Sequence, residues 1–153
     1  MIQRIQTVYL ALVAILCLLG LCLPLAQYFE DGSLVAAFNN FRFIEESKGA
    51  TADWGACGLS VLLVIVTLIT LMSIMLFRYR MRQLRLVIFS TILLVGYVIY
   101  YALLAWKFQM MTDADYNLCP AAIFPVLSII LNCLAIHGIR KDEALVRSLD
   151  RLR

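Results

Sequence analysis

Residues 61–106 read VLLVIVTLITLMSIMLF-RYRMRQLR-LVIFSTILLVGYVIYYALLAW. Two long apolar runs flank a short basic connector, residues 78–85, which contains four arginines. A transmembrane helix needs about 20 predominantly apolar residues, so each run is long enough to cross a bilayer. The connector is too short to hold a domain, and the two runs therefore predict an antiparallel helical hairpin within the membrane.

Two further apolar runs complete a set of four predicted spans, at residues 7–25, 54–77, 86–106 and 121–139. Hydrophobic residues make up 63% of the 153-residue chain and charged residues only 15%. A soluble domain is about 45–50% apolar and about 25% charged, so this composition indicates a membrane protein. The first run could instead be a signal peptide, but it is long for one and lacks a small-residue cleavage site. We expect an all-α membrane protein, with four transmembrane helices forming a single domain.

The charged residues fall in alternating blocks between the spans. The N-terminus, the connector and the tail at residues 140–153 together hold ten Lys/Arg and three Asp/Glu, a net charge of +7. The loops at residues 26–53 and 107–120 hold three Lys/Arg and seven Asp/Glu, a net charge of −4. Cytoplasmic loops carry the excess of Lys and Arg, so both termini are expected in the cytoplasm and both loops outside.

The first outer loop contains two short apolar runs, residues 33–38 and 41–44, on either side of Asn39 and Asn40. Asparagine tolerates the positive φ of a tight turn, so the two runs could pair as a β-hairpin. An interfacial helix is an equally good interpretation. In both cases the phenylalanines of these runs indicate that the loop packs on the membrane or on the helix ends.

The C-terminal tail reads RKDEALVRSLDRLR. Glu143 and Arg147 form an i,i+4 pair, and the leucines at 145, 149 and 152 form an apolar stripe, which together predict an amphipathic cytoplasmic helix. This helix could dock on a partner, or it could lie against anionic lipid headgroups. The residues expected to contact a partner or lipid are the basic and apolar side chains of the cytoplasmic face: Arg4, Arg78, Arg80, Arg82, Arg85, Arg140, Lys141, Leu145, Arg147, Leu149 and Arg151.

Few residues indicate chemistry. The four predicted spans contain no Asp, Glu, Lys or Arg, which argues against an ion-coupled transporter. There is a single histidine, His137, and the five cysteines form no C-x-x-C motif, so we expect no metal, no cofactor and no catalytic residue. Cys57 and Cys119 are predicted at the outer ends of two spans, on the oxidising side, where a disulfide could join them.

Polar residues inside the spans are interpreted mainly as contacts between helices. Ser128 and Asn132 are spaced i,i+4 on the fourth span, and such residues contribute about 0.6 kcal/mol each as interhelical hydrogen bonds. The alternative is a ligand site that they form together with Tyr97 and Tyr101.

Four stretches of the sequence resemble one family. These are MIQRIQTVYL at the start, MRQLRL in the connector, the Pro-containing start of the fourth span followed by LSIILN, and IRKDEALVRSLDRLR at the end. They resemble the bacterial membrane proteins of domain-of-unknown-function family 4293. The resemblance implies a small four-span protein of the bacterial inner membrane, and it implies no catalytic or binding residue.

These observations favour a non-enzymatic accessory or scaffold subunit. It would bind a membrane-protein partner, or a second copy of the chain, through its helices and its basic tail. The alternative is a protein that binds a small molecule, a quinone or a lipid between its helices and that could modify a lipid. A redox protein that uses Cys57 and Cys119 is a third hypothesis. Nucleic-acid binding is not expected, because there is no basic patch with interleaved aromatic residues away from the membrane-flanking positions.

Overall fold

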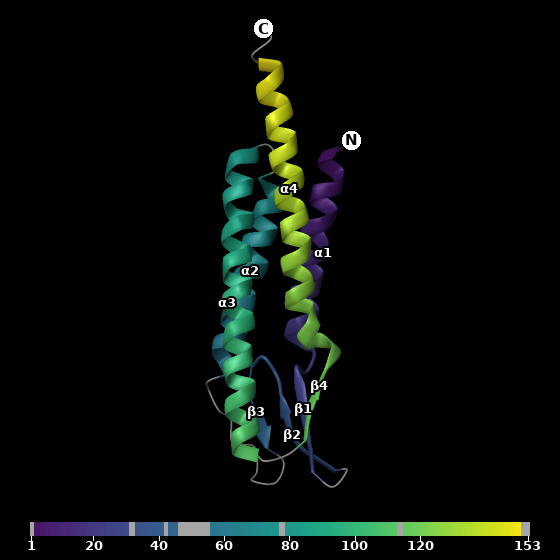
Figure 1. Ribbon diagram of the computed structural model, residues 1–153, viewed down its shortest axis with the longest axis vertical. Coiled ribbons are helices and arrows are strands. Elements are labelled where there is room, and N and C mark those ends of the chain that lie inside the picture. Colours follow the sequence, from purple (N-terminus) through teal and green to yellow (C-terminus); the bar gives the residue numbers. More distant parts are fainter. Residues whose placement is uncertain are drawn as a thin grey trace.

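The computed structural model describes residues 2–30, 33–41, 43–45, 56–76, 79–112 and 115–150. Four long helices lie side by side, and a small β-sheet lies at one end of them (Figure 1). The helices are α1 (Ile2–Cys22), α2 (Cys57–Met75), α3 (Arg80–Thr112) and α4 (Phe124–Asp150), the last preceded by the 3₁₀ helix η2 (Pro120–Ile123). Both α1 and α3 contact α2 and α4, so the four helices form a closed ring around a shared core.

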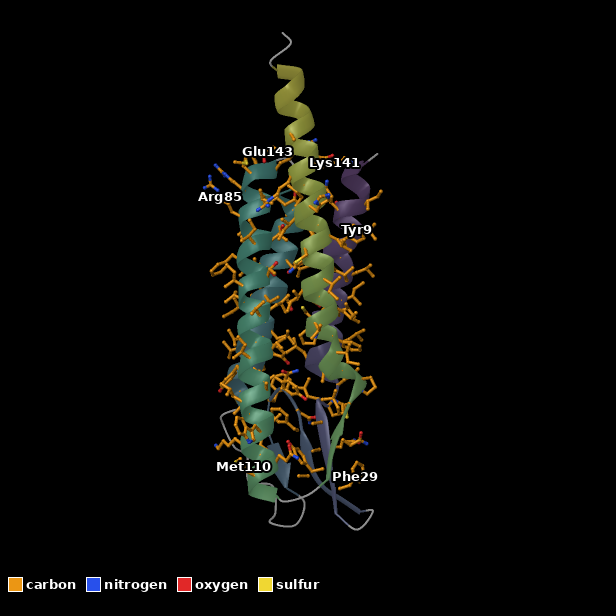
Figure 2. All side chains as sticks on the ribbon, in the orientation of Figure 1. Tyr9, Phe29, Arg85, Met110, Lys141 and Glu143 are labelled. Carbon is orange, nitrogen blue, oxygen red and sulfur yellow. The ribbon has the colours of Figure 1, made fainter. Side chains whose placement is uncertain are left out.

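All four helices are long and apolar enough to cross a membrane. Large apolar side chains such as Ile15, Leu68, Ile92 and Ile130 point away from the core and are exposed. Exposed side chains surround the bundle along its length (Figure 2). An apolar outer surface suits a lipid environment, since lipid tails are as apolar as these side chains. Of the predicted fold, four helices that are long and apolar enough to cross a membrane are confirmed.

The buried residues of three helices recur at alternating steps of three and four. This is the spacing of a seam that faces neighbouring helices in a left-handed bundle. On η2 and α4 the seam consists of Ala121, Pro125, Ser128, Asn132, Ala135, Ile139 and Asp142. On α1 it consists of Gln6, Leu10, Val13, Cys17 and Gly20, and on α3 it begins with Gln83, Val87, Ser90, Leu94 and Tyr97.

The helices extend beyond the predicted spans. The 33 residues of α3 make a helix of about 50 Å, whereas the hydrocarbon core of a bilayer is about 30 Å thick. Most of the connector at residues 78–85 is therefore the first turn and a half of α3, and residues 107–112 of the second outer loop are its last turns. The tail from Arg140 to Asp150 is a continuation of α4, not a separate helix.

The expectation of an all-α fold is wrong for the outer segments. Four antiparallel strands, β1 (Ala26–Glu30), β2 (Ser33–Phe38), β3 (Phe43–Glu45) and β4 (Asp115–Leu118), form one sheet in the order β3-β2-β1-β4. Strands β2 and β3 are the two arms of the hairpin expected around Asn39 and Asn40, so the interfacial helix is ruled out. The sheet forms because β1 also pairs with β4 from the second outer loop, with Ala26 opposite Leu118.

The sheet packs on the outer turns of α3, beside which it lies in Figure 1. The ring of Phe38 is fully buried, stacks on Tyr101 at 5.8 Å between centroids, and meets Phe108 edge-on at 5.2 Å. The Tyr28 hydroxyl donates to the Ala105 carbonyl at 3.4 Å. The outer part of α3 thus serves as the platform on which the sheet is built.

Candidate functional site

The basic residues of the predicted cytoplasmic face gather at the end of the bundle opposite the sheet. Arg82, Arg85, Arg140 and Lys141 are exposed there. Arg85 and Lys141 are labelled at that end in Figure 2, and Phe29 and Met110 are labelled at the sheet end. The Arg82 guanidinium lies 5.1 Å above the Tyr79 ring.

The other residues expected to contact a partner or lipid are only partly described. Arg4, Leu145, Arg147 and Leu149 lie in helices, but their side chains are outside the described part of the structure. Arg78 and Arg151 lie outside the described residues altogether.

The Arg80 side chain was expected to contact a partner or lipid. It also takes part in a polar cluster within the bundle. Asp142 on α4 is only 6% exposed, and its Oδ2 accepts a hydrogen bond from Gln6 Nε2 on α1 at 3.1 Å. Arg80 Nη1 lies 3.8 Å from the same oxygen and donates to the Asp142 carbonyl at 3.4 Å. We call Gln6, Arg80 and Asp142 the Asp142 cluster. It ties α4 to α1 and α3 at the level where the tail begins.

Gly138 lets α1 come close to α4 at this level. A Cβ on Gly138 would lie 3.1 Å from Cγ of Gln6, tighter than an ordinary contact. The glycine thus leaves the space through which the Gln6 side chain reaches Asp142.

A second polar cluster lies in the middle of the bundle, and each of the four helices contributes to it. Asn132 Nδ2 donates to Ser90 Oγ at 3.4 Å, and Ser90 Oγ lies 3.4 Å from Thr70 Oγ1. The Cys17 thiol lies beside the hydroxyls of Ser128 and Thr67. We call these six residues the central polar cluster: Cys17, Thr67, Thr70, Ser90, Ser128 and Asn132, all of them buried. Asn132 thus contacts α3, and Ser128 lies beside α1.

A third polar contact fixes the sheet to the outer end of the bundle. Asn40, in the turn between β2 and β3, is fully buried. Its Nδ2 donates to the Gly20 carbonyl at the end of α1 at 2.6 Å, and its Oδ1 accepts from the Tyr97 hydroxyl at 2.7 Å. Tyr101 donates instead to the Leu25 carbonyl at 3.5 Å. Both tyrosines therefore take part in holding the outer segments.

Cys57 and Cys119, between which the sequence allowed a disulfide, are both free thiols. The Cys57 thiol donates to the Phe41 carbonyl at 3.1 Å. The backbone N–H of Cys119 donates to the Leu25 carbonyl at 3.1 Å, which places this residue beside the sheet. Burial raises the pKa of the Cys119 thiol, which lowers its thiolate fraction at neutral pH.

The described side chains offer little for catalysis. Among them, no three His, Cys, Asp or Glu residues are grouped so that they could hold a metal ion. His137 is exposed on α4. The arrangement can bind polar groups through neutral hydroxyls and amides in the middle of the bundle and through guanidinium and ammonium groups at the basic end.

The comparison with known families decides where the chain belongs. The sequence model described as "Domain of unknown function (DUF4293)" matches residues 2–152. The chain is a member of the DUF4293 family. The match covers both ends of the four-helix bundle and the whole sheet, so the family corresponds to this complete fold. No curated protein matches the chain.

Membership of DUF4293 indicates no catalytic family and no residue roles, so roles must come from the geometry. Sequence reasoning overlooked Gln6, Asn40 and Asp142 as buried polar contacts. A signal existed for two of them, since Gln6 is four residues before Leu10 and Asp142 three after Ile139, which continues the seams of α1 and α4. For Asn40 the sequence offered no such signal, because its partners Gly20 and Tyr97 lie on other elements.

Proposed function

We propose that this DUF4293 protein is a non-enzymatic accessory subunit of the bacterial inner membrane. It holds the cytoplasmic end of α4 as a docking helix for a partner membrane-protein complex. Both termini lie in the cytoplasm, and the sheet lies outside. The observation that carries the proposal is that α4 continues as a helix to Asp150, beyond the level of the Asp142 cluster where α1 and α3 begin.

The buried seam of α4 supports docking because its spacing continues past the bundle. Steps of four and three from Asp142 reach Val146 and Leu149, both apolar, and Leu145 and Leu152 flank them in the sequence. Up to Asp142 the same seam packs on neighbouring helices. An apolar seam that runs beyond its own bundle is typical of a helix that packs against another protein.

The direction of α4 supports a protein partner over a lipid surface. The helix leaves the bundle along its long axis (Figure 1), and the Asp142 cluster ties it to α1 and α3 at the point of exit. A helix that lay on the headgroups would have to bend away from this axis. A short helix end is marginal in water by itself, so packing against a partner would stabilise it.

The exposed basic residues would fix the position of the tail relative to the membrane surface. Arg82 and Arg85 on α3 and Arg140 and Lys141 on α4 are exposed at the bundle end from which α4 emerges. Lys and Arg near the cytoplasmic leaflet gain about 1 kcal/mol each from anionic headgroups. These four residues would keep the exit of α4 at the membrane surface, with the tail beyond it.

The tail seam is expected to be the part that holds the partner. In a Leu145→Gln/Leu149→Gln variant, a protein that co-purifies with the wild type in mild detergent is expected to be depleted at least about tenfold, since burying each leucine contributes about 1.5–3 kcal/mol. The measurement is quantitative mass spectrometry of tagged protein at native expression. Truncation after Ala144, which keeps Asp142 and its contacts, is expected to give the same loss.

A matched control changes two positions of the same helix that lie away from Leu145 and Leu149. Arg147→Gln/Asp150→Gln replaces two residues and leaves the net charge unchanged, and by helical spacing both positions lie away from the leucines. This variant is expected to retain the partner. Equal depletion in both double variants, or turnover by the purified protein alone, would contradict the proposal.

The orientation is tested by reporter fusions. Green fluorescent protein fused after Arg153 is expected to be fluorescent, and alkaline phosphatase fused there inactive, because the phosphatase folds only on the oxidising side. Alkaline phosphatase fused after Gly49 in the first outer loop is expected to be active. The reverse pattern would place the sheet and the basic end on the opposite sides.

A second candidate function is binding of a small molecule, a quinone or a lipid between the helices. The observation that favours it is that Ser128 Oγ and Asn132 Oδ1 are buried without a hydrogen-bond partner. Tyr97 and Tyr101 do not extend that site, because their hydroxyls are bonded to Asn40 and to the Leu25 carbonyl. Organic extracts of the same preparations would contain a stoichiometric lipid or quinone under this candidate.

A further inference from the structure

The central polar cluster contains more hydrogen-bonding capacity than its own side chains satisfy. Ser128 and Asn132 are both fully buried, yet Ser128 Oγ and Asn132 Oδ1 have no hydrogen-bond partner. The Cys17 thiol lies beside Ser128, but a thiol is a weak donor and leaves that hydroxyl unsatisfied. An unsatisfied buried polar group costs about 1–3 kcal/mol, so two on one helix face need an explanation.

The neighbouring threonine hydroxyls already donate their protons to backbone carbonyls. Thr67 donates its hydroxyl to the Leu63 carbonyl at 2.7 Å, and Thr70 donates to the Val66 carbonyl at 2.8 Å. Neither hydroxyl has a second proton to give to Ser128 or Asn132, although both retain lone pairs. The contacts of Ser90 with Asn132 and with Thr70 are long, at 3.4 Å each. The cluster therefore lacks donors more than it lacks acceptors.

Buried apolar side chains flank the cluster on both sides along the bundle. Leu10, Val87, Ala135 and Ile139 form a buried layer between it and the Asp142 cluster. Towards the sheet, Leu63 and Leu94 are buried one turn from Thr67 and Ser90. No described side chain of the cluster is charged, so a molecule held there must be small, neutral and able to donate hydrogen bonds.

We propose that the central polar cluster is a binding site for water within the membrane-spanning bundle. A water molecule donates two hydrogen bonds and accepts up to two, which supplies the donors that Asn132 Oδ1 and Ser128 Oγ require. The threonine lone pairs add acceptors from α2, so the bound water links α4 to α2 where the side chains do not meet directly. This site is independent of the docking function proposed for the tail.

The direct test is solid-state NMR of the full chain in lipid bilayers, with asparagine side-chain amides labelled with ¹⁵N. Magnetisation transfer from water to the Asn132 amide is expected, at a strength similar to that at the exposed Asn117 and absent from the buried Asn40, whose contacts are all within the protein. No transfer to Asn132, or transfer from lipid chains in its place, would overturn the proposal.

Stability gives a second, independent readout with a matched control. Ser128→Ala removes a ligand of the water and is expected to raise the unfolding equilibrium constant about tenfold. Ser60→Ala is the control, because Ser60 is also a buried serine but its hydroxyl donates to the Cys57 carbonyl of its own helix at 2.8 Å. If Ser128 is truly unsatisfied, Ser128→Ala will instead stabilise the protein, and the proposal fails.

Discussion

Phe38→Ala is expected to detach the outer sheet from the bundle while the four helices persist. The substitution removes a fully buried ring from between Tyr101 and Phe108, at an expected cost of about 3–5 kcal/mol. Part of that loss is the aromatic contact itself, about 0.5–1.5 kcal/mol for such pairs. Hydrogen–deuterium exchange of the β1 and β2 amides is the measurement, since local opening of the sheet exposes them without unfolding the helices.

Phe41→Ala is the matched control for this prediction. Phe41 lies in the same turn region as Phe38, but its side chain is 53% exposed. Its contact with Cys57 is made by the backbone carbonyl and survives the substitution. We expect exchange in Phe41→Ala close to that of the wild type. Similar exchange in the two variants would mean that the Phe38 ring does not hold the sheet on α3.

Asn40→Ala is expected to destabilise the outer end of the protein by about 2–4 kcal/mol, because it leaves the Tyr97 hydroxyl and the Gly20 carbonyl without their partner. Both the Asn40 and the Tyr97 side chains are buried, so water cannot replace the lost bonds without a rearrangement. A double-mutant cycle with Tyr97→Phe, read out by denaturation in detergent, is expected to give a coupling energy of about 1–3 kcal/mol.

The neighbouring asparagine provides a sharp control. Asn39 Oδ1 is buried without a hydrogen-bond partner, so Asn39→Ala removes an unsatisfied group. We expect that variant to be neutral or slightly stabilised, in contrast to Asn40→Ala. A coupling energy near zero between positions 40 and 97 would show that the two side chains act independently.

The structure follows the sequence closely where a pattern is local. The hairpin of α2 and α3 was predictable because two apolar runs flank a connector too short for anything else. The β2–β3 hairpin was one of two interpretations of the segment around Asn39 and Asn40, and local sequence could not choose between them. The pairing of β1 with β4, which come from different loops, decided in favour of the hairpin. One hairpin alone is only marginally stable, and the two further strands extend it into a sheet.

The buried polar contacts were harder to predict from the sequence than the helices were. The reason differs from one contact to another. Ser128 and Asn132 were recognisable because they interrupt an apolar run. Asp142 was hidden in a charged tail, where an acidic residue normally indicates exposure. Its burial depends on Gln6 and Arg80, which belong to helices at the other end of the chain and in its middle.

The sequence by itself determined the four helices, their apolar outer surface and the separation of positive from negative charge. Helix formation and membrane insertion depend on residues that are close in sequence, so composition and spacing are sufficient for them. The tertiary structure alone decided the four-stranded sheet, its seat on α3, and the buried contacts of Asn40 and Asp142. Those features depend on groups that meet only after the four helices and the sheet have packed, and no local pattern records which groups will meet.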